Sequence, residues 1–240
     1  MPLKHQYGLL LLAALALAVT LCAGPASAHV AGKARAVKAS QQLVALDSTH
    51  MAYAQPDAGS KHLGFVNSER PITGAQTRLP LLRTDSTGTW LLVRLPGRPN
   101  SHTGWIKAEG TETQTTTWHL VVRTATRRVY VFNKGHVVRV FLAIVGKPST
   151  PTPHGEFFVE ESVAMPASAP GAPVALALSA RSGVFQEFEG GPGQIAMHGL
   201  SNVGGVLGTA VSHGCIRLAD ETVRWLGNRI NPGTPVTIKS

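Results

Sequence analysis

Short apolar runs separated by turn residues dominate the chain after about residue 42. Between residues 43 and 115 the runs LVAL, HMAYA, KHLGFV, LPLL, TWLLVRL and TGWI alternate with polar segments and with the turn sequence LPGRPN. Runs of this length, bounded by Gly, Pro, Asn or Ser, are typical of β-strands. The pattern predicts a small all-β unit over residues 43–117, with the polar stretch TETQTTT at its end serving as a boundary.

Residues 118–240 predict a second, mainly β unit. WHLVVR, RRVYVF, EFFVEE, QIAMH and GTPVTIK predict strands, HVVRVFLAIVG predicts one long strand, and NKG predicts a tight hairpin turn with Gly135 at positive φ. KPSTPTPHG contains too many prolines for a central strand, MPASAPGAP predicts a loop, and ALALSA is ambiguous. ADETVRWLGNRI predicts the one helix, with Val223, Leu226 and Ile230 on its buried face.

The first 28 residues have the pattern of an export signal. Lys4 precedes an uncharged apolar run over residues 8–23, and Ala26–Ala28 forms a small-residue cleavage site. Cleavage there leaves His29 as the first residue, and residues 29–42 then form a linker. The alternative is an uncleaved membrane anchor, although the run is shorter than the ~20 residues that a spanning helix needs.

Charge and cysteine content narrow the function classes. The formal net charge is +9, but no basic run is longer than Arg127-Arg128. Scattered basic residues argue against a nucleic-acid-binding tail and favour diffuse attraction to an anionic polymer such as a cell wall. If the signal is removed, Cys22 is lost with it, and Cys215 is then either a buried inert thiol or a reactive one.

One constellation predicts chemistry at Cys215. His198-Gly199 precedes the motif SHGCIR, which begins at Ser212. A thiol becomes nucleophilic when an imidazole takes its proton, and both His198 and His213 are candidates for that base. Gly214 allows close backbone approach to a substrate, and amides near it are candidates for an oxyanion hole. Both histidines precede the cysteine, which disfavours NlpC-type peptidases, where the nucleophile comes first.

The segments MHG…SHGCIRL resemble the signature of the YkuD-type L,D-transpeptidases. RVYVFNKGHVVRVFLAIVGKPSTPTPHGEF resembles the opening of that family's domain, and WLGNRINPGTPVTI resembles its close, so the resemblance covers about residues 118–240. It implies a YkuD-type β-sandwich catalytic domain with one C-terminal helix after the cysteine motif. WLLVRLPGRPNSHTGWI resembles small bacterial Src-homology-type β-barrels, in which Trp90 and Trp105 are expected as core residues.

The family resemblance also implies roles for single residues. Cys215 is the expected nucleophile, and His198 is the expected base, held by the carbonyl of Gly199. His213 shapes the site beside the thiol, and the amides of Gly214 and Cys215 are the expected oxyanion donors. Ser212 and Arg217 are expected to meet the substrate, and for Arg217 a structural role that steadies the loop is the alternative. Where the family often has a hydroxyl residue directly after the first His-Gly, this chain has Leu200 and then Ser201.

The implied activity is peptidoglycan L,D-transpeptidation through a cysteine thioester, with 3→3 cross-links as product, in an exported, cell-wall-associated monomer. No metal or organic cofactor is expected. Stem peptides are the expected substrates, carbapenems the expected covalent inhibitors, and nucleic acid is not an expected partner. The alternatives are an L,D-carboxypeptidase and a non-catalytic wall-binding module. The histidines expected at the surface are His102, His119, His136 and His154.

Overall fold

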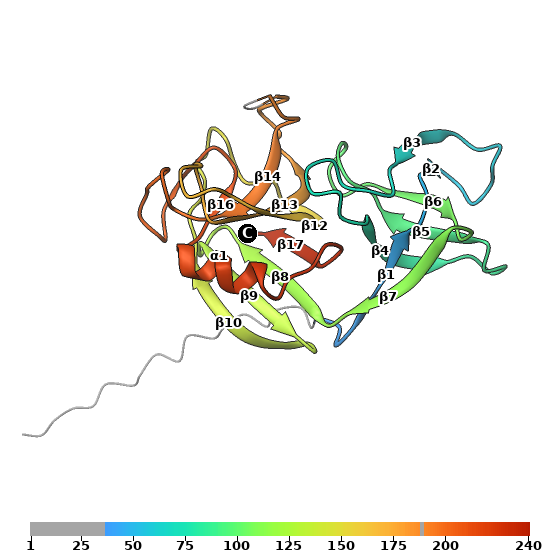
Figure 1. Ribbon diagram of the computed structural model, residues 1–240, viewed down its shortest axis with the longest axis horizontal. Helices are drawn as coiled ribbons and strands as arrows, with labels where there is room; N and C mark the ends of the chain where they lie inside the picture. Colours follow the sequence, from blue (N-terminus) through green and yellow to red (C-terminus); the bar gives the residue numbers. More distant parts are fainter. Residues whose placement is uncertain (1–36, 188–189) are drawn as a thin grey trace, which may run out of the picture. The chain divides into compact units, whose positions relative to one another are not determined.

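The computed structural model describes residues 37–187 and 190–240, which belong to one compact unit. The expected export signal and the first part of the expected linker lie outside the described residues. Within the described ranges, no helix is long and apolar enough to cross a membrane. Most of the strands in these ranges belong to two large sheets, and their one helix lies beside the second sheet (Figure 1). The expectation of a mainly β fold with one C-terminal helix is therefore confirmed.

The first sheet has seven strands in the order β3-β2-β6-β5-β4-β1-β7. All six apolar runs of the first unit form strands, and β1 begins within the range expected for the linker. The polar stretch expected as a boundary is a seventh strand, which pairs antiparallel with β1. Its threonines are β-branched and tolerate an exposed edge position, so a strand forms without an apolar face. The strands are β1 (Gln41–Leu46), β2 (His50–Tyr53), β3 (His62–Val66), β4 (Arg78–Thr84), β5 (Trp90–Arg94), β6 (Thr103–Lys107) and β7 (Thr111–Thr116).

The second sheet has eight strands in the order β10-β9-β8-β17-β12-β13-β14-β16. Two of its pairings are parallel, β17 with β8 and β14 with β16. The last strand therefore lies beside the first strand of this half of the chain. The strands are β8 (Trp118–Arg123), β9 (Arg128–Asn133), β10 (His136–Leu142), β12 (Gly155–Ala164), β13 (Val174–Arg181), β14 (Gln194–His198), β16 (Ile216–Arg217) and β17 (Pro235–Lys239).

The long strand expected from HVVRVFLAIVG is divided in two. β10 ends at Leu142, and β11 (Val145–Gly146) pairs instead with β15 (Ala210–Ser212) in a separate small sheet. Between them, Ile144 exchanges two backbone hydrogen bonds of 2.9 Å with Arg217, and the Ile144 side chain is fully buried. The break brings this segment against the cysteine motif, which one continuous edge strand cannot do. The expected hairpin turn is confirmed, with Lys134 and Gly135 both at positive φ.

The helix α1 (Asp220–Gly227) is shorter than expected. Its buried side chains include Val223 and Leu226, while Ile230 lies beyond its end yet is 1% exposed. A Cβ at Gly227 would lie 3.0 Å from Val174 of β13, so this glycine lets the helix approach the sheet closely. The core beneath α1 includes Leu176, Leu178, Met197, Ile216 and Leu218, all fully buried. This core holds β14, which ends at His198, and β16, which begins directly after Cys215.

Two buried acids join the sheets. A bulge in β12 between Val159 and Glu161 places Glu160 and Glu161 both in buried positions, although they are neighbours in the strand. Glu160 forms ion pairs with Arg181 of β13, at 3.0 Å, and with Arg70 from the first half of the chain. Glu161 accepts hydrogen bonds from Thr73. The run EFFVEE predicts a strand, but nothing in it predicts this buried charge cluster.

His119 is buried, at 8% exposure, and the expectation of a surface position is wrong. Gln41 Nε2 donates to its Nδ1 at 3.0 Å, so Nε2 donates to Thr237 Oγ1 at 2.9 Å, and that hydroxyl donates to Glu156. Burial, assisted by the nearby charge of Lys239, lowers the pKa of His119 to about 4. A neutral ring fits this chain of donors and acceptors.

Stability is therefore expected to fall on acidification through His119. The unfolded imidazole takes up a proton near its ordinary pKa of 6.5, whereas the folded ring does so only near 4. Lowering the pH through this window favours the unfolded state, by ~3 kcal/mol when complete. Denaturant unfolding of the native chain and of His119→Gln between pH 7 and 4 measures this contribution. Equal slopes of stability against pH in the two proteins would contradict it.

Candidate active site

The two parallel strands β14 and β16 place His198 and Cys215 on one face. Met197 pairs with Ile216 and His198 pairs with Arg217. Met197 and Ile216 are fully buried, and side chains alternate along extended chain, so the neighbours of this pair point to the opposite face. His198 follows Met197 and Cys215 precedes Ile216, and both are half-buried. The structure therefore brings the expected base, at the end of β14, and the expected nucleophile, one residue before β16, to neighbouring segments, with Arg217 directly across from His198.

A backbone hydrogen bond sets the His198 tautomer. Nδ1 lies 2.9 Å from the carbonyl oxygen of Gly199. A carbonyl oxygen only accepts, so Nδ1 carries the proton and Nε2 of the neutral ring is the proton acceptor. A general base needs this arrangement, with one nitrogen fixing the ring and the other able to take a proton. The role expected for the Gly199 carbonyl agrees with this contact.

One glycine makes room for the imidazole, and a second makes room for the backbone beside it. Gly171, with φ of +84°, lies in the loop between β12 and β13, and a Cβ there would collide with His198 Nδ1. A Cβ at Gly199 would collide with the carbonyl oxygen of Ala172 and with Asp220 Oδ1. The Gly199 amide also donates to the Gly171 carbonyl at 2.8 Å. Sequence reasoning placed Gly171 in a loop but missed its contact with the base.

Replacing Gly171 by alanine is expected to displace the His198 ring and lower the rate of Cys215 acylation by ~10²-fold, since misplacement by about an ångström has effects of this size. Rates are measured by intact-protein mass spectrometry. Gly88→Ala is the matched control, because Gly88 also has positive φ (+76°) but a Cβ there meets open space. A folded Gly171→Ala protein that acylates as fast as the control would refute this role.

The loop containing Cys215 is held by hydroxyl groups beneath it. Ser212 is fully buried, and its Oγ donates to the Cys215 carbonyl at 2.6 Å and accepts from the Gly214 amide at 3.1 Å. Thr150 donates to the Ser212 carbonyl and Thr152 to the Gly214 carbonyl. In this structure Ser212, expected at the substrate, and the Gly214 amide, expected at the oxyanion, both bond within the loop. The proline-rich segment 147–155 thus supports the cysteine loop through the hydroxyls of Thr150 and Thr152.

His213 is the exposed member of the motif. Its ring meets the ring of Phe185 edge-on, with centroids 6.0 Å apart and planes at 70°. Phe185 belongs to the loop that follows β13, so this contact brings a third segment to the site. His213 thus meets the loop that follows β13, whereas His198 belongs to the sheet.

Arg217 and Asp220 hold the loop that follows His198. Arg217 Nη1 donates to the carbonyls of Val203 and Gly204, at 3.4 and 3.3 Å. Asp220, the first residue of α1, accepts from the amides of Leu200 and Ser201 and from the Ser201 hydroxyl. The Ser201 hydroxyl and these amides lower the pKa of Asp220. The sequence predicts a helix in this segment, but not the contact of Asp220 with this loop.

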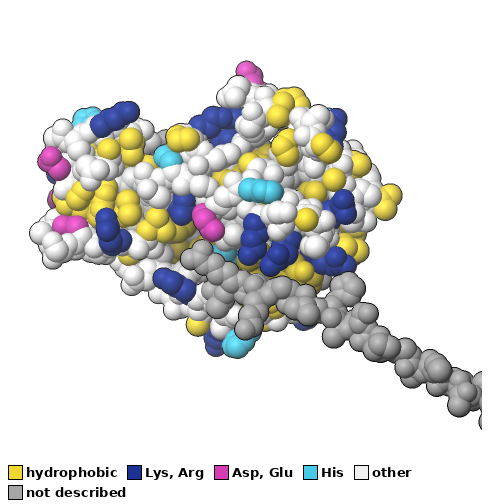
Figure 2. Space-filling model, turned by 180° about the vertical axis from the view of Figure 1, so that it is seen from behind, with side chains coloured by type: hydrophobic (Ala, Val, Ile, Leu, Met, Phe, Trp, Pro, Cys, Tyr) yellow, Lys and Arg dark blue, Asp and Glu magenta, His cyan; other side chains and the backbone are white. Residues whose placement is uncertain are grey.

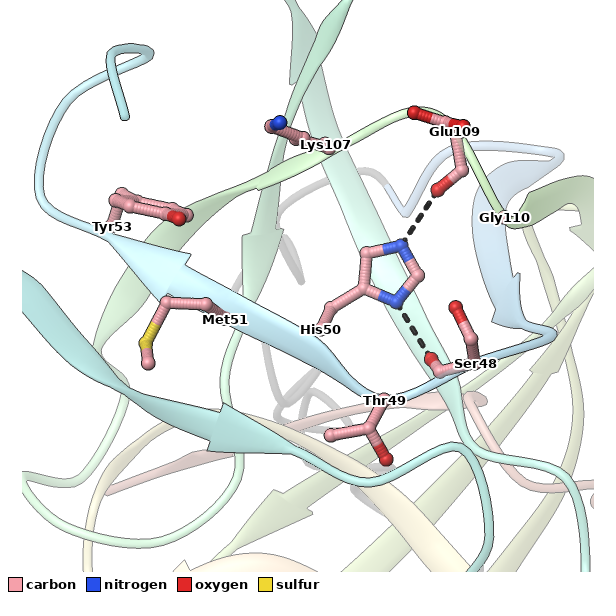
Figure 3. Close-up of a pocket in the computed structure, with 8 residues that line it drawn as sticks. All are labelled: Ser48, Thr49, His50, Met51, Tyr53, Lys107, Glu109 and Gly110. Atoms are coloured by element: carbon pink, nitrogen blue, oxygen red, sulfur yellow. Dashed lines mark hydrogen bonds between the residues drawn. The ribbon is translucent and has the colours of Figure 1, made fainter. Parts of the chain in front are cut away.

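A separate pocket of about 370 Å³ lies in the first sheet (Figure 3). Its central side chain, His50, is 6% exposed, with Nδ1 2.7 Å from the Ser48 carbonyl and Nε2 2.9 Å from the Glu109 carbonyl. Both nitrogens face backbone acceptors, so this histidine joins two turns. Across the described ranges, 37–187 and 190–240, no three His, Cys, Asp or Glu side chains gather as metal ligands do.

Comparisons with known proteins identify the family of this domain. Residues 117–238 match the YkuD family model, described as an L,D-transpeptidase catalytic domain. The chain therefore belongs to the YkuD family, and the resemblance found in its motifs is confirmed. L,D-transpeptidase 1 of Mycobacterium tuberculosis is 30% identical over 120 residues, which are 45% of each protein. The match thus spans about half the length of this curated relative.

Solved structures of L,D-transpeptidases also match. An enzyme from Mycobacterium smegmatis is 22% identical with a TM-score of 0.41, covering 80% of this chain and 99% of that one. L,D-transpeptidase 3 from Mycobacterium tuberculosis, in complex with a faropenem-derived adduct, is 18% identical with a TM-score of 0.40, covering 63% and 90%.

Proposed function

We propose that the protein is a peptidoglycan L,D-transpeptidase that forms 3→3 cross-links through a thioester on Cys215. Membership of the YkuD family supports the reaction class. One observation supports the assignment of the chemistry to these residues: β14 and β16 pair in parallel with His198 and Cys215 on one face, and the Gly199 carbonyl holds His198 Nδ1. This leaves Nε2 as the nitrogen that accepts the thiol proton.

The first half-reaction forms the thioester. His198 Nε2 accepts the proton of the Cys215 thiol, and Sγ attacks the carbonyl carbon of the third residue of a donor tetrapeptide stem. A backbone amide of the cysteine loop other than that of Gly214, which donates to Ser212 Oγ, stabilises the negative oxygen. The bond to the terminal D-alanine then breaks, and the imidazolium gives its proton to the departing amine. The products are free D-alanine and the acyl-enzyme.

The second half-reaction releases the acyl group. The side-chain amine of a diamino acid in a neighbouring stem attacks the thioester carbonyl, and His198 accepts a proton from that amine. The carbon–sulfur bond breaks, the new amide bond is the 3→3 cross-link, and the proton returns to the Cys215 sulfur. Atoms and charges balance without a cofactor. Water in place of the amine gives the L,D-carboxypeptidase reaction.

Mass spectrometry of the products tests the proposal. The chain without residues 1–28 is incubated with purified tetrapeptide muropeptides, and Cys215→Ser serves as the control. Cross-linked dimers together with released D-alanine are the expected products. Tripeptides alone would replace the proposal with carboxypeptidase activity, and unchanged substrate would favour a wall-binding module.

We also propose export to the cell wall. The support is the sequence pattern of a basic start, an apolar run and Ala26–Ala28. A net charge of +9 favours contact with an anionic wall polymer, and Figure 2 shows Lys and Arg side chains at several separate places on one face. The N-terminal residue of the secreted protein tests this. His29 is expected, and retention of residues 1–28 on most of the exported chain would overturn cleavage.

Carbapenems are proposed as covalent inhibitors. A thiolate that attacks a peptide carbonyl also attacks the strained carbonyl of a β-lactam, and the ring-opened product stays attached as a thioester. One adduct per chain, at Cys215, is the expected stoichiometry. Monomeric action is part of the same proposal, because all the proposed catalytic groups come from one chain.

A further inference from the structure

The turn between β5 and β6, in the first half of the chain, bonds to the end of β13 and to the loop that follows it. Asn100 Nδ2 donates to the Arg181 carbonyl at 2.7 Å, and the Arg181 amide donates to Asn100 Oδ1 at 2.8 Å. The Gly97 amide donates to the Ser179 carbonyl at 3.3 Å. The Asn100 side chain thus bonds to both the amide and the carbonyl of Arg181, the last residue of β13, as the backbone of a neighbouring strand would.

Arg98 continues this contact into the loop itself. Its Nη2 donates to the carbonyls of Ser182 and Phe185, at 2.9 and 3.0 Å, and its Nη1 donates to the Pro192 carbonyl at 2.9 Å. One guanidinium therefore joins both ends of the loop between β13 and β14, two strands labelled in Figure 1. A planar fork of donors suits three fixed carbonyl oxygens better than the single ammonium of a lysine.

The carbonyl of Phe185 that Arg98 holds belongs to the residue whose ring meets His213. His213 lies two residues before Cys215. The amides of Val184 and Phe185 donate to Ser182 Oγ, so segment 182–185 is a tight turn with a fixed direction. Val184 is 50% exposed and Val211, beside the motif, is 51% exposed. Phe185 therefore lies against the cysteine motif, and the residue before it, Val184, is an exposed apolar side chain.

We propose that Arg98 and Asn100 are positioning residues for the reaction at Cys215. They hold segment 182–187 so that Val184 and Phe185 form one wall of the site in which the donor stem peptide lies. The proposal rests on the proposed function only for the identity of this peptide. It gives the first half of the chain a role in the reaction, since the wall depends on a turn that lies outside the matched family domain at residues 117–238.

Three measurements on Arg98→Ala test the proposal. Hydrogen exchange of segment 182–187 is expected to become at least ~10-fold faster, because its carbonyls lose their partner. The kcat/KM for the donor tetrapeptide is expected to fall ~10-fold through misplacement of the wall. Alkylation of Cys215 by iodoacetamide, which is too small to need the wall, is expected to keep its rate.

Matched variants separate positioning from general damage. Arg83→Ala removes an exposed arginine of the same unit, which stacks on Trp105, and is expected to change none of the three measurements. Arg98→Lys is expected to restore part of the exchange protection. Asn100→Asp keeps the acceptor but loses the donor to Arg181, and it gives a second route to the same result if Arg98→Ala folds poorly.

The outcomes distinguish this proposal from the proposed function. Unchanged exchange of 182–187 in both Arg98→Ala and Asn100→Asp would overturn the positioning role, whatever the activity. An equal loss of iodoacetamide alkylation and tetrapeptide turnover would also overturn it, because the thiol itself would then be affected. A native chain that alkylates but never releases D-alanine would refute the proposed function, while the exchange result would still decide the positioning role.

Discussion

Cys215→Ser is expected to release no measurable D-alanine from the tetrapeptide, a loss of at least ~10³-fold. Serine is close in size, so the loop and its bonds to Ser212 remain possible. A hydroxyl, however, loses its proton far less readily than a thiol, and one imidazole placed for a thiol does not compensate. Liquid chromatography with mass spectrometry follows D-alanine release by the native chain and the variant.

The control for Cys215→Ser is a comparison of its thermal unfolding with that of the native chain. The Ser212 hydroxyl and the Thr150 and Thr152 bonds contact only backbone atoms of the loop, so the thermal midpoint is expected to match that of the native chain. Turnover retained in the serine variant would mean that another group is the nucleophile. Loss of both turnover and folding would move the same test to Cys215→Ala.

His198→Ala is expected to lower the acylation rate by ~10²–10⁴-fold, the range typical for loss of a general base. His198 has Nδ1 on a backbone carbonyl, which leaves Nε2 as the acceptor. His213 instead packs against Phe185, so His213→Ala is expected to act through geometry with a smaller loss. His136→Ala, an exposed histidine on the edge strand β10, is the matched control and is expected to keep full activity.

Single-turnover acylation measured by intact mass decides between the two histidines. The assignment predicts the order of rates His136→Ala, then His213→Ala, then His198→Ala. A normal rate in His198→Ala together with a slow rate in His213→Ala would reverse the assignment of the base.

Local patterns predicted most of the strands and the position of His198. The run QIAMH ends a strand at His198 because Ile195 and Met197 alternate into the core, as a buried strand requires. Lys134 and Gly135 form the expected hairpin turn for a similarly local reason, since residues with positive φ define it. The motif SHGCIR made Cys215 the candidate nucleophile, and the family resemblance then implied His198, rather than His213, as its base.

Non-local contacts account for what the sequence did not predict. His119 looks like a surface histidine, yet Gln41 and Thr237, far apart in the chain, cover it and bond both nitrogens. Gly171 lies against His198 only because a loop folds back over β14. Arg98 is one of many arginines, and its importance depends on three carbonyls about ninety residues further on. These three contacts depend on segments that meet only in the folded chain, so residue type and spacing along the sequence did not reveal them.

Intact-protein mass spectrometry after incubation with a carbapenem tests most directly whether Cys215 is an activated nucleophile in an acyl-transfer site. The native chain is expected to gain the mass of one carbapenem, and peptide mapping is expected to place it on Cys215. Cys215→Ser is expected to stay unmodified under the same conditions. No adduct on the native chain, or an equal adduct on Cys215→Ser, would contradict both the nucleophile assignment and the transpeptidase function that depends on it.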